Sequence, residues 1–264
     1  MRWMVWSCRC RKNRSEMRGA AAVIGALLFA RPVLAEPWVA SGGGNIAAAR
    51  FEAPDDSYPH RIMGQIQERR VLAVRDASGV EIRHDLRQGP EPSHVFEDMA
   101  PRLVDADGDG QTDVVVVESS PTQGAQLAIY TLRRGQLVKS AATPQIGTRF
   151  RWLAPAAIAD LNGDGITDIA YVETPHLGKT LRVWSWAPGG LTQIASLTGV
   201  TNHRIGDEVI WGGVRDCGPG PEIIVADAGF REVVAVAFDG ADLTARPLGI
   251  TANPEGFAQA LTCG

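Results

Sequence analysis

Short runs of apolar and β-branched residues recur from Asn45 to the end of the chain, separated by turns rich in Gly, Pro, Asp and Ser. Apolar positions do not follow the 3.6-residue period of a helix, whereas runs of strand length between turn signals are typical of β-strands. The pattern therefore predicts an all-β fold. The first unit of this fold is expected to have strands at residues 45–52, 70–75 and 80–86.

The next two units repeat one plan, in which a short strand leads into an acidic loop, an apolar strand and a hairpin. The predicted strands of the second unit are 100–104, 113–118, 126–132 and 136–140, and those of the third are 156–159, 168–173, 180–186 and 191–197. Residues 114–117 and 169–172 are uninterrupted apolar runs. Such runs bury both faces of a strand, which predicts a sheet packed between two others.

A fourth unit at residues 203–250 has a shortened loop at 216–221, a hairpin formed by strands 233–238 and 243–247, and a segment 257–263 that closes the chain. Four units of about 50 residues, each with about four strands, are typical of radial blades. We therefore expect a small β-propeller of about four blades, or five, as one domain over residues 45–264.

The two acidic loops share one spacing of oxygen-bearing side chains and two glycines, and they lie 55 residues apart in sequence, at Asp105 and Asp160. Carboxylates gathered in this way repel one another unless a hard cation lies among them. We therefore predict a calcium site in each loop. The candidate ligands are Asp105, Asp107, Asp109, the carbonyl of Gln111 and Asp113 in the first loop, and Asp160, Asn162, Asp164, the carbonyl of Ile166 and Asp168 in the second.

Other readings of these loops fit less well. An EF-hand needs a glutamate at position 12 and flanking helices, but position 12 is Val116 in one loop and Tyr171 in the other, within predicted strands. Zinc is disfavoured because neither loop contains His or Cys. The bound calcium is expected to stabilise the fold rather than to act in a reaction.

An acidic loop of this spacing ahead of an apolar strand resembles the FG-GAP or VCBS repeat, as found in the amino-terminal propeller of integrin α chains and in many secreted bacterial proteins. The resemblance covers residues 95–245, strongly in two units and weakly in the fourth. It implies a calcium-stabilised β-propeller. Members of that family usually have seven blades, whereas this chain has room for four or five, so the sequence leaves open whether the ring closes alone.

The amino-terminal residues read as an export signal. A basic start, the uncharged stretch 19–30 and the small-x-small sequence 33–35 predict a signal peptide at residues 1–35, with Met17 as an alternative start, followed by a flexible lead-in at 36–44. The uncharged stretch is too short for a membrane anchor. We therefore expect a periplasmic or extracellular protein with no transmembrane anchor after cleavage.

Charge and cysteine content agree with export. Residues 1–35 hold 7 of the 26 Lys and Arg but one of the 30 acidic residues, which leaves 19 basic and 29 acidic residues and a net charge of −10. Such an acidic chain is a poor partner for nucleic acid or anionic membranes. The remaining cysteines, Cys217 and Cys263, are expected to form a disulfide, with two free thiols as the alternative.

Five histidines and several tryptophans are the remaining candidates for a binding site. His60 and His203 share the local sequence His-Arg-Ile and are candidates for one mouth of the ring, while His176 reads as a solvated loop residue. Four tryptophans could stack on sugars or fill the spaces between blades: Trp152, Trp184, Trp186 and Trp211.

Familiar sequence motifs of nucleophilic, phosphate-binding and zinc-peptidase sites are missing from the sequence. The first hypothesis is a secreted, non-catalytic binding module for an unidentified protein or glycan, with calcium as its cofactor. A polysaccharide hydrolase or lyase on a propeller scaffold, and a scaffold protein of the cell envelope, are the alternatives. The sequence leaves these open because catalytic groups of propellers come from separate blades.

Overall fold

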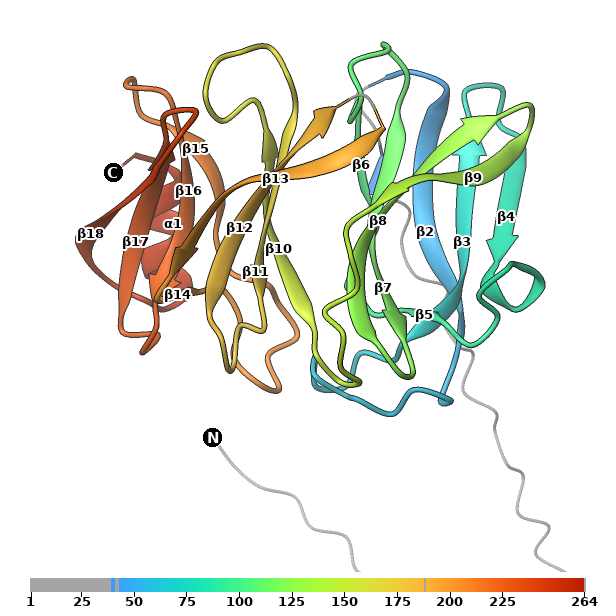
Figure 1. The fold of residues 1–264 in the computed structure, drawn as a ribbon, viewed down its shortest axis with the longest axis horizontal. Helices are drawn as coiled ribbons and strands as arrows, with labels where there is room; N and C mark the ends of the chain where they lie inside the picture. Colours follow the sequence, from blue (N-terminus) through green and yellow to red (C-terminus); the bar gives the residue numbers. More distant parts are fainter. Residues whose placement is uncertain (1–38, 41–42, 188, 264) are drawn as a thin grey trace, which may run out of the picture. The chain divides into compact units, whose positions relative to one another are not determined.

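A computed structural model describes residues 39–40, 43–187 and 189–263 of the chain. These residues are drawn in colour in Figure 1, and all of them belong to the unit of residues 35–264. The predicted signal peptide at residues 1–35 and the choice between Met1 and Met17 lie outside the described residues.

The described residues form strands, one 3-10 helix and one α-helix. The strands of the first half are β1 (Val39–Ala40), β2 (Ile46–Pro54), β3 (Arg69–Asp76), β4 (Glu81–Asp85), β5 (Val95–Phe96), β6 (Arg102–Val104), β7 (Asp113–Ser120), β8 (Gly124–Arg133) and β9 (Gln136–Ala142), with η1 at Leu86–Gln88. Those of the second half are β10 (Leu153–Ala159), β11 (Asp168–Glu173), β12 (Thr180–Ala187), β13 (Gly190–Thr198), β14 (Val200–Thr201), β15 (Gly213–Asp216), β16 (Pro221–Asp227), β17 (Glu232–Phe238) and β18 (Leu243–Thr251), followed by α1 (Pro254–Leu261). The predicted all-β class is confirmed.

The strands pair in antiparallel fashion and repeat one four-stranded order. The units are β1-β2-β3-β4, β6-β7-β8-β9, β10-β11-β12-β13 and β15-β16-β17-β18. The short strand β5 pairs with both β3 and β7 and so joins the first two units into one nine-stranded sheet, while the third and fourth units are separate sheets. None of the three sheets closes on itself.

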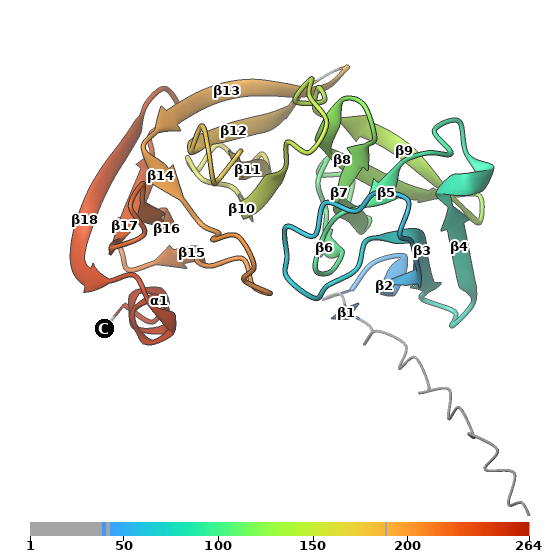
Figure 2. The ribbon, with the colours of Figure 1, turned by 90° about the horizontal axis from the view of Figure 1, so that it is seen from below.

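The four units follow one another along an arc (Figure 2). The last strand of each unit lies on its outer side, where β4 contacts β9, and β13 contacts both β9 and β18. The first strands β6, β10 and β15 lie on the inner side, and β10 contacts β15. Each acidic loop joins an inner strand to the next strand of its unit.

Strand β7 is buried on both faces, as its run of four valines predicts. Val114 and Val116 pack in a cluster with the first unit, whereas Val115 and Val117 pack against the third unit. Another cluster joins the third unit to the fourth in the same way, with β11 residues Ala170 and Val172 on one side. The cores therefore lie between successive sheets, as the apolar runs predict.

The two ends of this series of sheets are covered differently. On the first unit, Glu52 accepts hydrogen bonds from Arg83 and Arg50, so this face is lined by ion pairs. On the fourth unit, Phe257 and Ala260 of α1 pack against β16 and β17. Terminal repeats need such caps because no neighbouring repeat covers their outer faces.

Helix α1 corrects the sequence prediction, which recognised no helix at the end of the chain. Asn253 caps the helix by accepting a hydrogen bond from Gly256 N at 2.7 Å, and Pro254 occupies the first turn. Asparagine followed by proline is a helix-start signal. The helix has only eight residues, and a periodic pattern of that length is too short to be separated from a strand.

Loops of the first and fourth units contact each other directly. Gly206 N donates to the carbonyl of Ile62 at 3.1 Å, and Gln65 N donates to Glu208 Oε1 at 3.1 Å. Gly64 has a φ of +62°, and a Cβ placed there would lie 2.6 Å from the Gly206 carbonyl. The chain thus bridges its first and last units through loops, although their sheets stay separate.

The lead-in predicted as flexible is partly structured where it is described. Val39–Ala40 pairs with β2, and Thr112 Oγ1 donates to the carbonyl of Gly43 at 2.6 Å. Residues 41–44 read Ser-Gly-Gly-Gly, so this part of the sequence has too few apolar side chains to predict a strand pairing. Among the described residues, no helix has the length and apolar character needed to cross a membrane.

Candidate functional site: acidic loops and a histidine pocket

The first acidic loop, residues 105–113, is held in shape by its own first carboxylate. Asp105 Oδ1 accepts from Gly108 N at 2.8 Å and Asp105 Oδ2 accepts from Gly110 N at 2.9 Å. Gly110 has a φ of +83°, a left-handed conformation that glycine adopts without steric cost. Asp109 Oδ1 also accepts from the N–H of Gln111 at 2.7 Å.

The second acidic loop, residues 160–168, repeats these contacts. Asp160 accepts from Gly163 N at 2.7 Å and from Gly165 N at 2.9 Å, and Asp164 Oδ1 accepts from Ile166 N at 2.8 Å. Asn162 stands where the first loop has an aspartate, and its Nδ2 donates to Asp164 Oδ2 at 3.0 Å. The matched spacing in the sequence therefore corresponds to matched geometry.

The last carboxylate of each loop is buried at the start of the following strand. Asp113 Oδ2 accepts from Ala106 N at 3.2 Å, and Asp168 Oδ2 accepts from Leu161 N at 3.2 Å. Burial, together with the nearby Asp107 and Asp109, raises the pKa of Asp113 to about 6. Burial also raises the pKa of Asp168. Charge at these positions is therefore unfavourable without a cation.

Two observations fit a hard cation in these loops. Carboxylate oxygens of Asp105, Asp107 and Asp109 all lie within 4.8 Å of one another. In the second loop, Asp168 Oδ1 is buried and has no hydrogen-bond partner among the described residues. The donors are all oxygen atoms, which suit calcium or magnesium rather than zinc or copper. When bound, such an ion would supply positive charge to both loops.

Each acidic loop is also tied to the preceding unit by a threonine. Thr112 of the first loop donates to Gly43, next to the first unit, and its N–H donates to Asn45 Oδ1 at 2.9 Å. The equivalent Thr167 of the second loop donates to the carbonyl of Asp105 in the first loop at 3.1 Å. The shape of an acidic loop therefore affects how neighbouring sheets are joined.

The corresponding turn of the fourth unit has a covalent link instead. Cys217 and Cys263 form a disulfide with a Cα–Cα distance of 5.6 Å across 46 residues of sequence, which confirms the predicted pair. Asp216 Oδ1 still accepts from Gly218 N at 2.8 Å, so part of the turn remains. The disulfide fastens α1 to the turn that lacks the other acidic ligands.

A second group of acidic side chains carries its own cation. Glu118 is fully buried, and its carboxylate accepts from His94 Nδ1 at 2.6 Å, from Lys139 Nζ at 2.9 Å and from the Tyr130 hydroxyl at 2.8 Å. Glu91 also pairs with Lys139. We call Glu91, His94, Glu118 and Lys139 the Glu118 cluster. Although burial would raise it, the pKa of Glu118 is lowered to about 2 by His94 and Lys139.

At the other end of the strands that follow the acidic loops lies a pocket of about 210 Å³, which we call the histidine pocket. Ser120 ends β7 and Glu173 ends β11, next to the segments that form it. Its lining residues come from loops of three units: His60, Ile62, Phe150, Arg151, Trp152, Thr174, Pro175, His176, Leu177 and Ile205.

His60 is anchored in this pocket by a buried carboxylate. Its Nδ1 lies 2.5 Å from Glu97 Oε1, and Ser119 Oγ donates to Glu97 Oε2 at 2.5 Å. Glu97 is fully buried, and burial raises its pKa while the contacts with His60 and Ser119 oppose that shift. The His60 ring also stacks on Phe150, with ring centroids 5.0 Å apart.

His176 and His203 form a second anchored pair. His176 Nε2 lies 2.9 Å from His203 Nδ1, and His203 Nε2 lies 3.0 Å from the carbonyl of Asp207. Burial, together with the neighbouring His203 and His60, lowers the pKa of His176 to about 4. Burial also lowers the pKa of His203. Both rings are therefore neutral near pH 7.

The sequence pattern predicts His60 and His203 at one mouth of a ring, and the structure places them differently relative to the histidine pocket. His60 lines the pocket, but His203 is only 1% exposed and lies behind His176. The two His-Arg-Ile segments meet through Ile62 and Ile205, which both line the pocket. His176, interpreted from the sequence as solvated, is a lining residue whose Nε2 is bonded to His203.

Glu97 and Phe150 were not recognised from the sequence. Glu97 lies next to Phe96, which ends the short strand β5, and nothing in its sequence neighbours marks it as a partner of His60. Phe150 has a φ of 59°, which a sequence does not reveal for a bulky residue. Of the tryptophans, Trp152 and Trp184 pack in the core between the second and third units, so they fill space between sheets.

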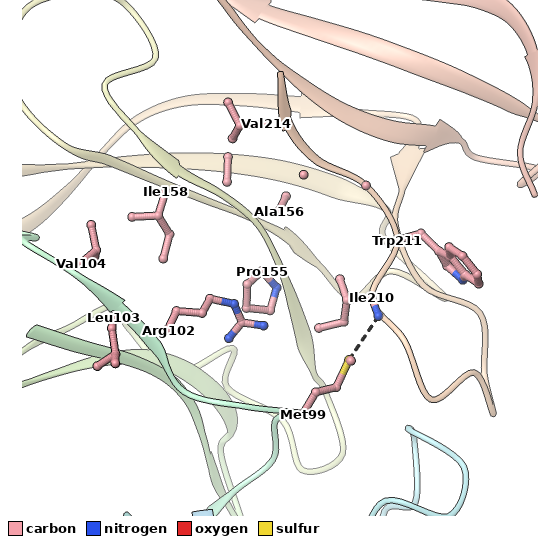
Figure 3. Close-up of a pocket in the computed structure, with 13 residues that line it drawn as sticks. Met99, Arg102, Leu103, Val104, Pro155, Ala156, Ile158, Ile210, Trp211 and Val214 are labelled. Carbon is pink, nitrogen blue, oxygen red and sulfur yellow. Dashed lines mark hydrogen bonds between the residues drawn. The ribbon is translucent and has the colours of Figure 1, made fainter. Parts of the chain in front are cut away.

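A cavity of about 420 Å³ lies among the inner strands (Figure 3). It is lined mainly by apolar and small side chains of β6, β10 and the segment before β15, and Ile210 N donates to Met99 Sδ at 3.2 Å across it. Arg102 lines this cavity too, but the buried Asp98 accepts two hydrogen bonds from it, at 2.7 and 3.1 Å. The charge of this guanidinium is therefore already balanced.

Residues 105–171 match the FG-GAP-like repeat family, which confirms the predicted resemblance for that segment. The chain therefore contains an FG-GAP-like repeat that spans the two acidic loops and β11 up to Tyr171. A search of curated proteins gives no match.

Several solved structures share a distant likeness with the chain. An exo-β-1,3-galactanase from Phanerochaete chrysosporium is 11% identical at a TM-score of 0.43, over 80% of this chain and 50% of that one. An exo-β-1,3-galactanase from Clostridium thermocellum is 11% identical at a TM-score of 0.44, over 81% of this chain and 50% of that one. An exotype rhamnogalacturonan lyase is 14% identical at a TM-score of 0.42, over 80% of this chain and 43% of that one. The chain spans half or less of these proteins, and likeness at this level transfers neither fold nor activity.

Proposed function

We propose that the protein is an exported, calcium-stabilised module of the β-propeller type that binds a protein or glycan without transforming it. The main observation behind this proposal is the matched geometry of the two acidic loops, each of which leads into a strand buried between sheets. Calcium in both loops would neutralise the gathered carboxylates and keep the neighbouring units in register. The arrangement of the four units along an arc and the loop bridge between the first and the fourth support a propeller-type arrangement of four blades.

The binding role rests on the histidine pocket at the opposite end of the same strands. Its lining residues belong to loops of different units, so the pocket takes its shape from the arrangement of the sheets. Loops on a rigid scaffold are the usual place for binding residues. Export is supported by the Cys217–Cys263 disulfide, because disulfides persist in oxidising compartments.

One arrangement favours a second candidate function, a hydrolase or lyase that acts on a polysaccharide. The buried Glu97 orients His60, and a histidine oriented by a carboxylate can act as a general base. In a hydrolase, His60 Nε2 would take a proton from the attacking water. A soluble polysaccharide panel assayed for new reducing ends or unsaturated products tests this function, and loss of such activity in His60→Gln would favour it over binding alone.

The first test of the binding module is a pair of measurements on the purified protein. We expect a chelator to lower the melting temperature and calcium to restore it, and we expect a glycan array or a pull-down in calcium to give saturable binding. A melting temperature that changes with neither chelator nor calcium would contradict the proposed stabilisation by calcium. Product formation from a bound polysaccharide would contradict the non-catalytic part.

A further inference from the structure

The histidine pocket contains two imidazole rings whose tautomers are fixed by buried partners. With Glu97 ionised, its carboxylate can only accept, so His60 Nδ1 carries the proton and donates to it. In the neutral ring, Nε2 is then a hydrogen-bond acceptor. Among the described residues, His60 Nε2 has no hydrogen-bond partner. This nitrogen is therefore available to a ligand.

The second imidazole, His176, also keeps one nitrogen as an acceptor, because its partner His203 is itself hydrogen-bonded to Asp207. The carbonyl of Asp207 can only accept, so His203 Nε2 donates to it and the neutral ring presents Nδ1 as an acceptor. His176 Nε2 then donates to His203 Nδ1, which leaves His176 Nδ1 with its lone pair. His60 and His176 both line the pocket. A ligand that supplies two hydrogen-bond donors is complementary to these two ring nitrogens.

Two of the eight described non-glycine residues with positive φ line this pocket. Phe150 and Thr174 both line it, and both have left-handed backbones, with φ of 59° and 44°. For a bulky or β-branched residue this conformation is unfavourable. Strain of this kind is retained mainly where it positions functional groups. Thr174 directly precedes the segment that presents His176, and Phe150 is the residue on which His60 stacks.

Charge and exposure narrow the kind of ligand. Arg151 lines the pocket and none of the lining residues is acidic, so a lysine or arginine side chain would be repelled. Two imidazole lone pairs disfavour a carboxylate or phosphate. Leu177 and Ile205, also in the lining, are 64% and 71% exposed. They offer an apolar surface for the C–H groups of a ligand.

We propose that the histidine pocket binds one sugar residue of a glycan, with two of its hydroxyl groups donating to His60 Nε2 and His176 Nδ1. An uncharged ring with hydroxyl groups on its edge and C–H groups on its face fits both the acceptors and the apolar rim. This inference rests on the proposed function and narrows its ligand from a protein or glycan to a glycan.

Nitrogen chemical shifts of the five histidine rings, measured by NMR on the calcium-loaded protein, test the proposal directly. The probes are neutral methyl pyranosides at millimolar concentration, added one at a time. We expect His60 to have the proton on Nδ1 and His176 on Nε2, and we expect at least one pyranoside to shift the signals of both rings. The proposal would be overturned by the opposite tautomer of either ring. It would also be overturned if no pyranoside shifted the signals of both rings.

Two variants and two matched controls give the affinity. His176→Phe keeps an aromatic ring but removes the acceptor, and Ile205→Trp fills the pocket from an exposed position. We expect each to weaken pyranoside binding at least tenfold. The controls are His84→Phe and Val80→Trp, outside the pocket, with Val80 55% exposed. Both should bind as the unchanged protein does. Unaltered affinity in Ile205→Trp would overturn the proposal even if His176→Phe did not fold.

The outcomes separate this inference from the proposed function. Glycan binding that is unaffected by both pocket variants would overturn the pocket assignment and leave the module proposal standing. A melting temperature that does not respond to calcium would contradict the module proposal, whereas pyranoside shifts at His60 and His176 would still support the pocket.

Discussion

The first acidic loop and the Glu118 cluster both gather acidic groups, and they differ in what balances the charge. In the Glu118 cluster, Lys139 lies between two carboxylates and the pKa of Glu118 is lowered to about 2. In the acidic loop, the described residues place no lysine or arginine among the carboxylates, and the pKa of Asp113 is raised to about 6. One group is balanced by its own lysine, and for the other we propose a cation from solution.

Removing calcium should have the largest effect, because it acts on both acidic loops and leaves the Glu118 cluster unchanged. At a free calcium concentration of about 100 times Kd, each site contributes about 2.7 kcal/mol to stability. Two sites give about 5 kcal/mol, or a fall in Tm of about 10 °C for a domain of this size. Thermal melts in chelator and in calcium measure this. Equal melting temperatures in chelator and in calcium would show that the acidic loops, like the Glu118 cluster, need no added ion.

Breaking the disulfide should have the next largest effect, and it should not depend on calcium. The Cys217–Cys263 link closes a loop of 46 residues, for which the chain-entropy estimate is about 4 kcal/mol. We expect Cys217→Ser to lower Tm by about 8 °C both in calcium and in chelator. If the calcium response disappeared in this variant, the turn of the fourth unit would be coupled to the acidic loops rather than independent of them.

Lys139→Met tests the cluster that carries its own cation. Removing Lys139 leaves the buried Glu118 without its lysine partner, with only His94 and Tyr130 still bonded to it, at a cost of about 3 kcal/mol. Thermal melts should show this loss equally in calcium and in chelator. A variant that became calcium-dependent would show that Lys139 occupies a site for an ion.

The acid side of the stability curve sharpens the same contrast. The pKa of Glu118 is lower in the folded protein than its usual value of 4.5, so the folded state binds fewer protons there. This contribution is present above pH 4.5 and is lost as the pH falls towards 2. We expect Lys139→Met to flatten that part of a pH-dependent denaturation curve. An unchanged acid limb would contradict the role given to Lys139.

Asp109→Ala should have the smallest effect, and its sign should depend on calcium. In calcium the variant should lose about 2.7 kcal/mol, the contribution of one site. In chelator it should be as stable as the unchanged protein or more so, because one of the repelling carboxylates is gone. Asp239→Ala is a matched control in the fourth unit, where Asp239 only accepts turn hydrogen bonds from Ala241 and Asp242. Its effect should be the same in both conditions.

Much of the fold could be predicted because its signals are local. The valine run at 114–117 indicates a strand buried on both faces, and the glycines of each acidic loop indicate a left-handed turn. Helix α1 was missed because Asn253 and Pro254 mark its start but only eight residues follow. The pairing of Val39–Ala40 with β2 could not be predicted, because the glycines that follow it give no strand signal.

The acidic loops were more predictable than the histidine pocket for the same reason. All predicted ligands of one loop lie within nine residues of sequence, from Asp105 to Asp113. By contrast, His60 and Glu97 are 37 residues apart, and His176 and His203 are 27 apart. Their contacts exist only once the units are arranged. The shared His-Arg-Ile segments indicated a relation between two loops but not which ring nitrogens they would present.

Calcium stoichiometry in the purified protein tests the central claim most directly. Isothermal titration of the chelator-treated protein should give two calcium ions per chain, and Asp109→Ala should give one while keeping the site of the second loop. Zero ions in the unchanged protein, or two in the variant, would contradict the assignment of one ion to each acidic loop.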